Sequence, residues 1–153
     1  MTSNKILDKA QHIEFSWTHH ALTIIPLLWA GMILGISFLE APVKFSTPSI
    51  TREIAFDVGQ TVFTAFNFTE WAWLGLFVIA LSFHGWSKSL SLFFYILVAI
   101  LLIQSFWLLP ELKYHANQII NNQKIESSFV HTTYIVVECL KLILLIGLGI
   151  IKK

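Results

Sequence analysis

The chain has 153 residues, of which 56% are hydrophobic and only 12% are charged, and its mean hydropathy is +0.70. An ordinary soluble domain carries roughly 25% charged residues, so a lipid-facing surface explains this balance better than an unusually large core does. The formal net charge of +1 gives no basis for binding nucleic acid. The length fits one domain, and the single cysteine, Cys139, excludes an internal disulfide.

The first 17 residues mix charged and apolar side chains, for example Lys5, Asp8 and Glu14 beside Ile6 and Leu7. This pattern predicts a short amphipathic helix on the membrane surface. Acids and bases precede the first apolar run, which is not typical of a cleavable signal peptide. We therefore expect the first apolar helix to remain as an anchor.

Four apolar segments follow, over residues 18–39, 60–83, 89–109 and 129–151. Each is close to the ~20 residues that a helix needs to cross a bilayer. Pro26 is predicted to kink the first span. Pro42 predicts that the chain leaves the membrane after that span, and Pro110 that the third span ends there.

Two further helical segments are predicted at the membrane surface. A helix start is predicted near Ser49 or Thr51, and residues 51–58 are expected to form an interfacial first part ahead of the second span. Residues 111–124 are polar with periodic Leu112 and Ile119, which predicts a second surface helix. The predicted fold is therefore all-α, a single domain of residues 1–153 that forms a four-helix transmembrane bundle with short interfacial amphipathic helices.

The distribution of basic residues predicts the orientation. One side of the membrane would carry five lysines and the other four basic residues, so both termini are expected in the cytoplasm. The five are Lys5, Lys9, Lys88, Lys152 and Lys153, and the four are Lys44, Arg52, Lys113 and Lys124.

Unusual polar residues concentrate at one end of the predicted bundle. Because successive spans alternate in direction, the end of the first, the start of the second, the end of the third and the start of the fourth share one side. This pattern indicates a cavity that opens to that side, expected to be periplasmic. The residues expected at its entrance are Glu40, Lys44, Asp57, Glu111 and His115.

The fourth span carries four polar residues on one helical face. His131, Tyr134, Glu138 and Lys141 follow spacings of three, four and three residues. A rise of ~1.5 Å per residue puts Lys141 ~15 Å from His131, near the middle of the membrane. Ionisable groups at this depth cost ~2.5–3.5 kcal/mol each, so they are expected to face the bundle interior and to pair. The predicted buried cluster comprises Asn67, Glu70, Gln104, His131, Tyr134, Glu138 and Lys141.

Two interpretations of this cluster stay open at the level of sequence. It is either internal glue between helices or the polar part of a pocket for a lipid-like or quinone-like molecule, walled by aromatic residues such as Phe63 and Trp71. Glu70, Glu138 and Lys141 together carry a net charge of minus one when all are ionised. Either one acid stays protonated or a cationic ligand completes the site, and this imbalance favours a functional site.

Other functions are considered on weaker patterns. Glu70, His131 and Glu138 are ligand types of carboxylate-bridged metal sites, but the repeated Glu-x-x-His pattern is missing. Intramembrane Glu, Lys and His also suit proton or ion transport, although no inverted repeat is visible. An assembly subunit would use small residues for partner or homo-oligomer contacts. These are Gly31, Gly35, Gly147 and Gly149.

The sequence lacks serine nucleophile elbows, phosphate-binding glycine loops and paired cysteines. Soluble-type hydrolase, kinase and thiol-redox chemistry are therefore not expected. No motif identifies a cofactor or a reaction.

Three short segments, GISFLEAPVKF (35–45), DVG (57–59) and NFTEW (67–71), carry a family resemblance. In these segments the chain resembles small four-helix bacterial integral membrane proteins. It is similar more loosely to the anthrone-oxygenase-like membrane families, which also place a glycine and then a proline after the first helix. The resemblance implies four membrane helices and a location in a bacterial inner membrane, and it assigns no catalytic residue.

Overall fold

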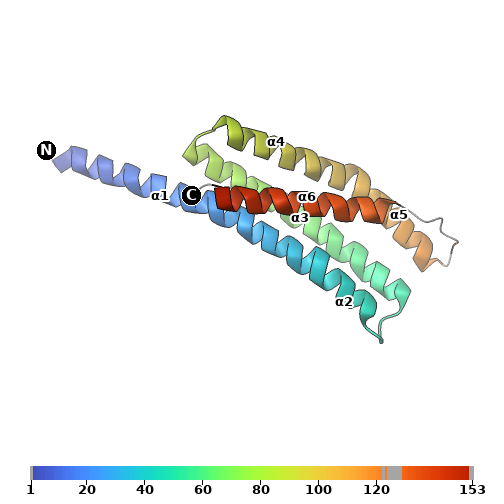
Figure 1. The fold of residues 1–153 in the computed structure, drawn as a ribbon. Coiled ribbons are helices and arrows are strands. Elements are labelled where there is room, and N and C mark those ends of the chain that lie inside the picture. Colours follow the sequence, from blue (N-terminus) through green and yellow to red (C-terminus); the bar gives the residue numbers. More distant parts are fainter. Residues whose placement is uncertain (1, 122, 124–128, 152–153) are drawn as a thin grey trace.

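The computed structural model describes residues 2–121, 123 and 129–151, with side chains described within residues 17–150. Four helices are long and apolar enough to cross a membrane, and they lie side by side (Figure 1). The prediction of an all-α bundle of four transmembrane helices is confirmed. The helices are Trp17–Ser46, Arg52–His84, Lys88–Ile120 and Val130–Ile150.

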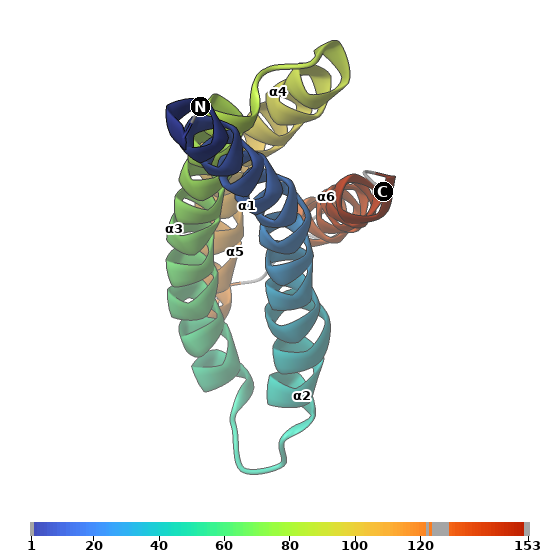
Figure 2. The same cartoon turned by 90° about the vertical axis from the view of Figure 1, so that its left-hand side faces the viewer.

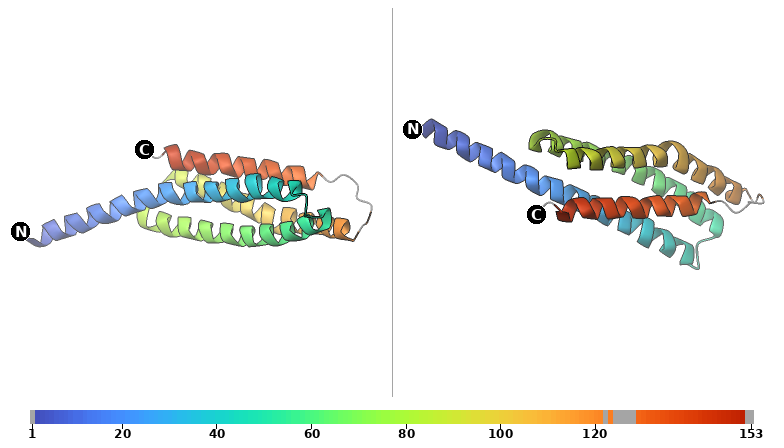
Figure 3. Two further views of the ribbon diagram at one scale, coloured as in Figure 1. Left: turned by 90° about the horizontal axis from the view of Figure 1, so that it is seen from below. Right: turned by 45° about the horizontal axis from the view of Figure 1, so that its top comes forward.

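The first membrane helix consists of three successive elements, α1 (Thr2–Ile33), a π-helical turn η1 (Leu34–Glu40) and α2 (Ala41–Ser46). The amphipathic N-terminal segment is continuous with α1 and projects beyond the other helices (Figure 3), so it does not form a separate surface helix. Helix structure also continues past Pro42 to Ser46 instead of breaking near Glu40. Pro42 lies in the first turn of α2, directly after the π-helical turn, and because it has no N–H it leaves one helical carbonyl without a backbone donor.

The third membrane helix repeats this construction with α4 (Lys88–Ile103), a π-helical turn η2 (Gln104–Leu108) and α5 (Leu109–Ile120). Pro110 again lies in the first turn after the π-helical turn, and the helix does not end there. The predicted surface helix is therefore the continuation of the span. These 33 residues extend about 50 Å, beyond the ~30 Å hydrocarbon core of a bilayer.

The second membrane helix, α3 (Arg52–His84), is one uninterrupted helix. It starts where the sequence predicted, because the Thr51 hydroxyl accepts a hydrogen bond from the Ile54 amide at 3.4 Å. It ends at Gly85, whose φ of 94° favours glycine. The Ser87 hydroxyl then accepts from the Leu90 amide at 3.3 Å and starts α4. The expected interfacial break near residue 59 does not occur.

The four membrane helices pack around one core. Helix α1 lies between α3 and α6 (Val130–Ile151), as Figure 2 shows, and α3 also contacts α5. Helices α1 and α6 approach closely at Gly149, where an added Cβ would lie 2.6 Å from Leu27. The core beside the α3–α4 turn is apolar and includes Leu22, Phe77, Leu81, Leu90, Leu97, Leu145 and Leu148.

Candidate functional site

A fully buried lysine lies at the centre of the bundle. The Nζ atom of Lys141 in α6 donates to Gln104 Oε1 at 2.7 Å and to Glu138 Oε1 at 3.0 Å. It also forms an ion pair with Glu70 of α3. An ammonium group has three donors, so Lys141 is fully satisfied by these three acceptors.

Two further hydrogen bonds connect the acids to the remaining helices. The Trp29 indole of α1 donates to Glu70 Oε1 at 3.1 Å, and the Gln104 amide of η2 donates to Glu138 Oε1 at 2.7 Å. All five residues have an exposed fraction of 0%. We call them the Lys141 cluster. It ties all four membrane helices together at one depth, as the buried positions of Glu70, Glu138 and Lys141 in the sequence predicted.

The acids of the Lys141 cluster keep one unused oxygen each. Glu70 Oε2 and Glu138 Oε2 are buried and have no hydrogen-bond partner among the described residues. Leaving a buried polar atom unpaired costs about 1–3 kcal/mol, and more for a charged group, so each such atom needs an explanation. With two carboxyl groups for one ammonium group, the cluster also has an excess of acid.

Glu138 borders a cavity of about 160 Å³ between the first and fourth membrane helices. We call it the Glu138 cavity. Pro42 and Ile135, which line it, are exposed on the outer surface of the first and fourth membrane helices. The Ser37 hydroxyl at its wall is buried without a partner. The lining residues are Ser37, Phe38, Ala41, Pro42, Phe45, Phe63, His131, Tyr134, Ile135 and Glu138.

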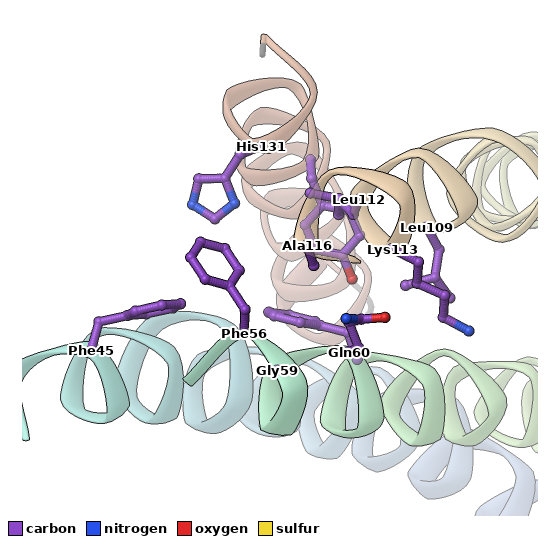
Figure 4. Close-up of a pocket in the computed structure, with 11 residues that line it drawn as sticks. Phe45, Phe56, Gly59, Gln60, Leu109, Leu112, Lys113, Ala116 and His131 are labelled. Carbon is purple, nitrogen blue, oxygen red and sulfur yellow. The ribbon is translucent and has the colours of Figure 1, made fainter. Parts of the chain in front are cut away.

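A smaller outer pocket of about 60 Å³ adjoins the Glu138 cavity, because Phe45, Phe63, His131 and Tyr134 line both. It lies between α2, α3, α5 and α6, and His131 faces Phe56 across it (Figure 4). Phe63 and Tyr134 pack edge to face, with ring centroids 5.4 Å apart. The two hollows together present aromatic walls with few polar groups. The outer pocket is lined by Phe45, Phe56, Gly59, Gln60, Phe63, Leu109, Leu112, Lys113, Ala116, His131 and Tyr134.

Both π-helical turns supply residues to this region. Ser37 and Phe38 of η1 line the Glu138 cavity, and Gln104 of η2 belongs to the Lys141 cluster. π-Helical turns inside α-helices are rare and occur frequently at functional sites. Here the extra residue in each π-helical turn changes the direction of the side chains that follow, at the depth where the Glu138 cavity meets the Lys141 cluster.

The expected entrance residues lie around the outer pocket in three groups. Lys44 is buried against Gly59 and pairs with Glu40 at 3.0 Å. Glu111 and His115 pair along α5 at 3.3 Å. Asp57 is exposed and lines a separate open groove on α3 that also includes Lys113.

Asn67 does not join the Lys141 cluster. Its Oδ1 accepts from the Ser105 hydroxyl at 2.9 Å, and Ser105 accepts from the Trp71 indole at 2.9 Å. This second polar bridge joins α3 to η2. Tyr134 and His131, expected in the same cluster, line the Glu138 cavity instead of contacting Lys141.

Sequence reasoning missed Trp29, Ser37 and Ser105. The indole N–H of Trp29 carries no charge and stands in an apolar run, so no periodic pattern exposes it. The two serines do share a signal. The pattern S-F-x-x-x-P begins in each π-helical turn and ends in the helix that follows, as SFLEAP (37–42) and SFWLLP (105–110), and this short repeat marks both residues.

The geometry favours a metal site or a transport path less than it favours a pocket. Within the part of the chain that the structure describes, no group of three His, Cys, Asp or Glu side chains is placed to hold a metal ion. Lys141 lies between Glu70 and Glu138, where a bridging metal would have to sit. Beyond the Lys141 cluster, toward the α3–α4 turn, the core described above is hydrophobic.

Comparisons with protein-family models, with curated proteins and with solved structures found no match to this chain. The site is therefore interpreted from its own geometry.

Proposed function

We propose that this multi-pass membrane protein binds a lipid-like or quinone-like small molecule in the Glu138 cavity. The observation that carries the proposal is Glu138 itself. One of its oxygens is held by Lys141 and Gln104, while the other has no partner and the residue borders the cavity. Apolar pockets with a few convergent polar groups are the usual form of small-molecule sites.

The surroundings of the cavity support binding better than passage. An ion or proton crossing the bilayer would need polar groups on both sides of the Lys141 cluster. Between the Lys141 cluster and the Thr18–His84 contact beside the α3–α4 turn, it would meet Phe77, Leu81 and Leu97 instead. The cavity therefore has one open end and one closed end, which suits a ligand that enters from the membrane and returns to it.

Native mass spectrometry of the protein released from lipid discs tests the proposal. The wild-type chain is expected to carry a bound amphiphile. Ala41→Trp fills the Glu138 cavity and is expected to abolish the adduct, whereas Ala72→Trp on the outward face of α3 should retain it. Equal adducts on all three proteins, or a wild-type chain that emerges without any, would contradict the proposal.

An assembly role is the second candidate, supported by two outward-facing glycines. An added Cβ at Gly31 or Gly35 would meet nothing within 4 Å, so this face of the first membrane helix has room for a neighbouring helix. Gly149, by contrast, is occupied by Leu27 of the same chain. The same mass spectra report the oligomeric state, and Gly35→Leu is expected to dissociate an oligomer if this face forms one.

We infer that both termini lie in the cytoplasm, from the small excess of lysine on that side, and that the membrane is a bacterial inner membrane, from the family resemblance alone. Lys124, Lys152 and Lys153, which enter this comparison, lie outside the described residues. Thiol labelling of intact cells tests the orientation in a Cys139→Ser background. An impermeant reagent should modify Lys113→Cys and spare Lys88→Cys, and the reverse pattern would invert the topology.

A further inference from the structure

We propose that the Glu138 cavity selects a single aromatic ring that bears a hydroxyl group, that is, a phenol or hydroquinone head with an apolar tail. This inference rests on the proposed function and narrows its ligand class. It favours the reduced, hydroxyl-bearing form of a quinone-like molecule over the oxidised, carbonyl-bearing form.

The size and walls of the cavity determine the ring. Its volume is about 160 Å³. A protein cavity of about 150 Å³ lined by apolar side chains is known to hold one benzene molecule. The walls include Phe38, Phe45, Phe63 and Tyr134, and aromatic side chains pack favourably with another ring edge to face or offset.

The charge balance of the Lys141 cluster determines the hydroxyl. One proton on either acid makes the cluster neutral. Glu70 is buried against Trp29 and Lys141, whereas Glu138 borders the cavity, so desolvation bears more heavily on Glu70. With the proton on Glu70, the free Glu138 Oε2 is a carboxylate oxygen, which only accepts hydrogen bonds.

A ligand that satisfies Glu138 Oε2 must therefore donate a hydrogen bond. A phenol O–H can do so, while a quinone carbonyl or a methyl ether cannot. The unpaired Ser37 hydroxyl at the same wall can accept or donate, so it accommodates a second ring substituent without deciding between the forms. The Tyr134 hydroxyl and His131 also line the cavity, but neither makes a hydrogen bond to Glu138 Oε2 in the structure. Lys44 is paired with Glu40, and Lys113 does not line the Glu138 cavity.

The opening of the cavity determines where the tail goes. Pro42 and Ile135 at the rim are exposed on the lipid-facing surface of the first and fourth membrane helices. A ring inside the cavity can thus keep an alkyl tail in the bilayer. The head group can then reach the cavity without passing the charged entrance residues on α2, α5 and the start of α3.

Binding of three matched ring compounds to the full chain in lipid discs tests the inference. 4-Hexylphenol, 4-hexylanisole and hexylbenzene share the ring and tail, and only the phenol donates a hydrogen bond. A hydrogen bond to a charged group contributes about 1.5–3 kcal/mol, so the phenol is expected to bind about 10-fold or more tighter than the anisole. Glu138→Gln should reduce this preference, because an amide oxygen is a weaker acceptor than a carboxylate oxygen.

A second pair of variants tests the cavity without changing Glu138, in case Glu138→Gln does not fold. Ile135→Trp narrows the rim and is expected to weaken phenol binding, while Val136→Trp, its exposed neighbour outside the cavity lining, should not. Equal affinity for phenol and anisole, or binding of a hexylamine-type amphiphile in place of both rings, would overturn the inference and leave the proposed function standing. If no amphiphile of any of these classes binds, the proposed function itself fails.

Discussion

The two ends of this bundle are built from the same helices but from opposite chemistry. Next to the α3–α4 turn, the core consists of side chains such as Leu81, Leu97 and Leu145, with exposed fractions of 0%. About halfway along the helices, the core changes to the Lys141 cluster and then opens into the Glu138 cavity and the outer pocket. One end is a packed scaffold, and the other holds polar groups whose hydrogen-bonding capacity is not used up.

This difference shows where stability and function are separated in a small membrane protein. The apolar end can hold the helices together through packing alone. The Lys141 cluster then adds ion pairs that are costly to desolvate and that apolar residues could replace. If the cavity binds a ligand as proposed, the position of these charges beside it explains why they are kept. Substitutions at the two ends should therefore differ in kind as well as in size.

The largest effect is expected when both acids are removed and the lysine remains. Glu70→Gln combined with Glu138→Gln leaves the Lys141 ammonium buried without a counter-charge, which should cost ~3–5 kcal/mol of unfolding free energy. Either single change should cost less. Adding Lys141→Met to the double variant should restore most of the loss, since a fully neutral core carries no buried charge. Chemical unfolding in detergent gives the unfolding free energy of the two single variants, the double variant and the triple variant relative to the wild-type protein. A triple variant as unstable as the double variant would contradict this account.

Removing the lysine alone should make stability depend on pH. In Lys141→Leu, Glu70 and Glu138 can stay buried only by holding protons that they release on unfolding at neutral pH. More protons are then bound in the folded state than in the unfolded state, so stability falls as pH rises, by about 1.4 kcal/mol per pH unit for each such proton. Leu97→Ala at the apolar end is the control, with a loss of ~2–5 kcal/mol that should not change with pH. Thermal melting between pH 5 and pH 8, about the range where this applies, compares the two.

Part of this contrast was available from the sequence, because charged residues in an apolar helix must face inward and pair. The periodic spacing of Tyr134, Glu138 and Lys141 thus placed them on one face, and the depth of Glu70 brought it to the same level. The π-helical turns could not be predicted by assuming 3.6 residues per turn. They carry helix structure past Pro42 and Pro110 and rotate the residues around them. For that reason the predicted breaks and the partner of Asn67 differ from the structure.

A moderate effect is expected where α1 and α6 touch. The added methyl group of Gly149→Ala would lie 2.6 Å from Leu27, so the two helices or the leucine must shift, at ~1–3 kcal/mol. Gly75→Ala on the exposed side of α3 meets nothing within 4 Å and should be neutral or stabilising by ~0.5–1 kcal/mol. Thermal melting of both variants decides the matter, and equal shifts would show that the close approach at Gly149 is not real.

The smallest effects are expected at the helix caps, one at each end of the bundle. Thr51→Ala removes the cap of α3 beside the outer pocket, and Ser87→Ala removes the cap of α4 beside the apolar core. Each should cost ~1 kcal/mol. We expect 4-hexylphenol to change the loss of melting temperature only for Thr51→Ala, because α3 begins at the end of the bundle that holds the pocket. Melting with and without 4-hexylphenol measures this, and an equal response of the two variants would remove the distinction between the ends.

The difference in accessibility between the two ends is the central claim, and thiol reactivity measures it most directly. In a Cys139→Ser background, Ser37→Cys lies at the wall of the Glu138 cavity and Ala80→Cys lies in the apolar core. The account predicts that a small thiol reagent modifies Ser37→Cys in the folded protein, that 4-hexylphenol slows this reaction, and that Ala80→Cys reacts only after unfolding. Modification of Ala80→Cys as fast as Ser37→Cys would contradict the account, since both ends would then be equally open.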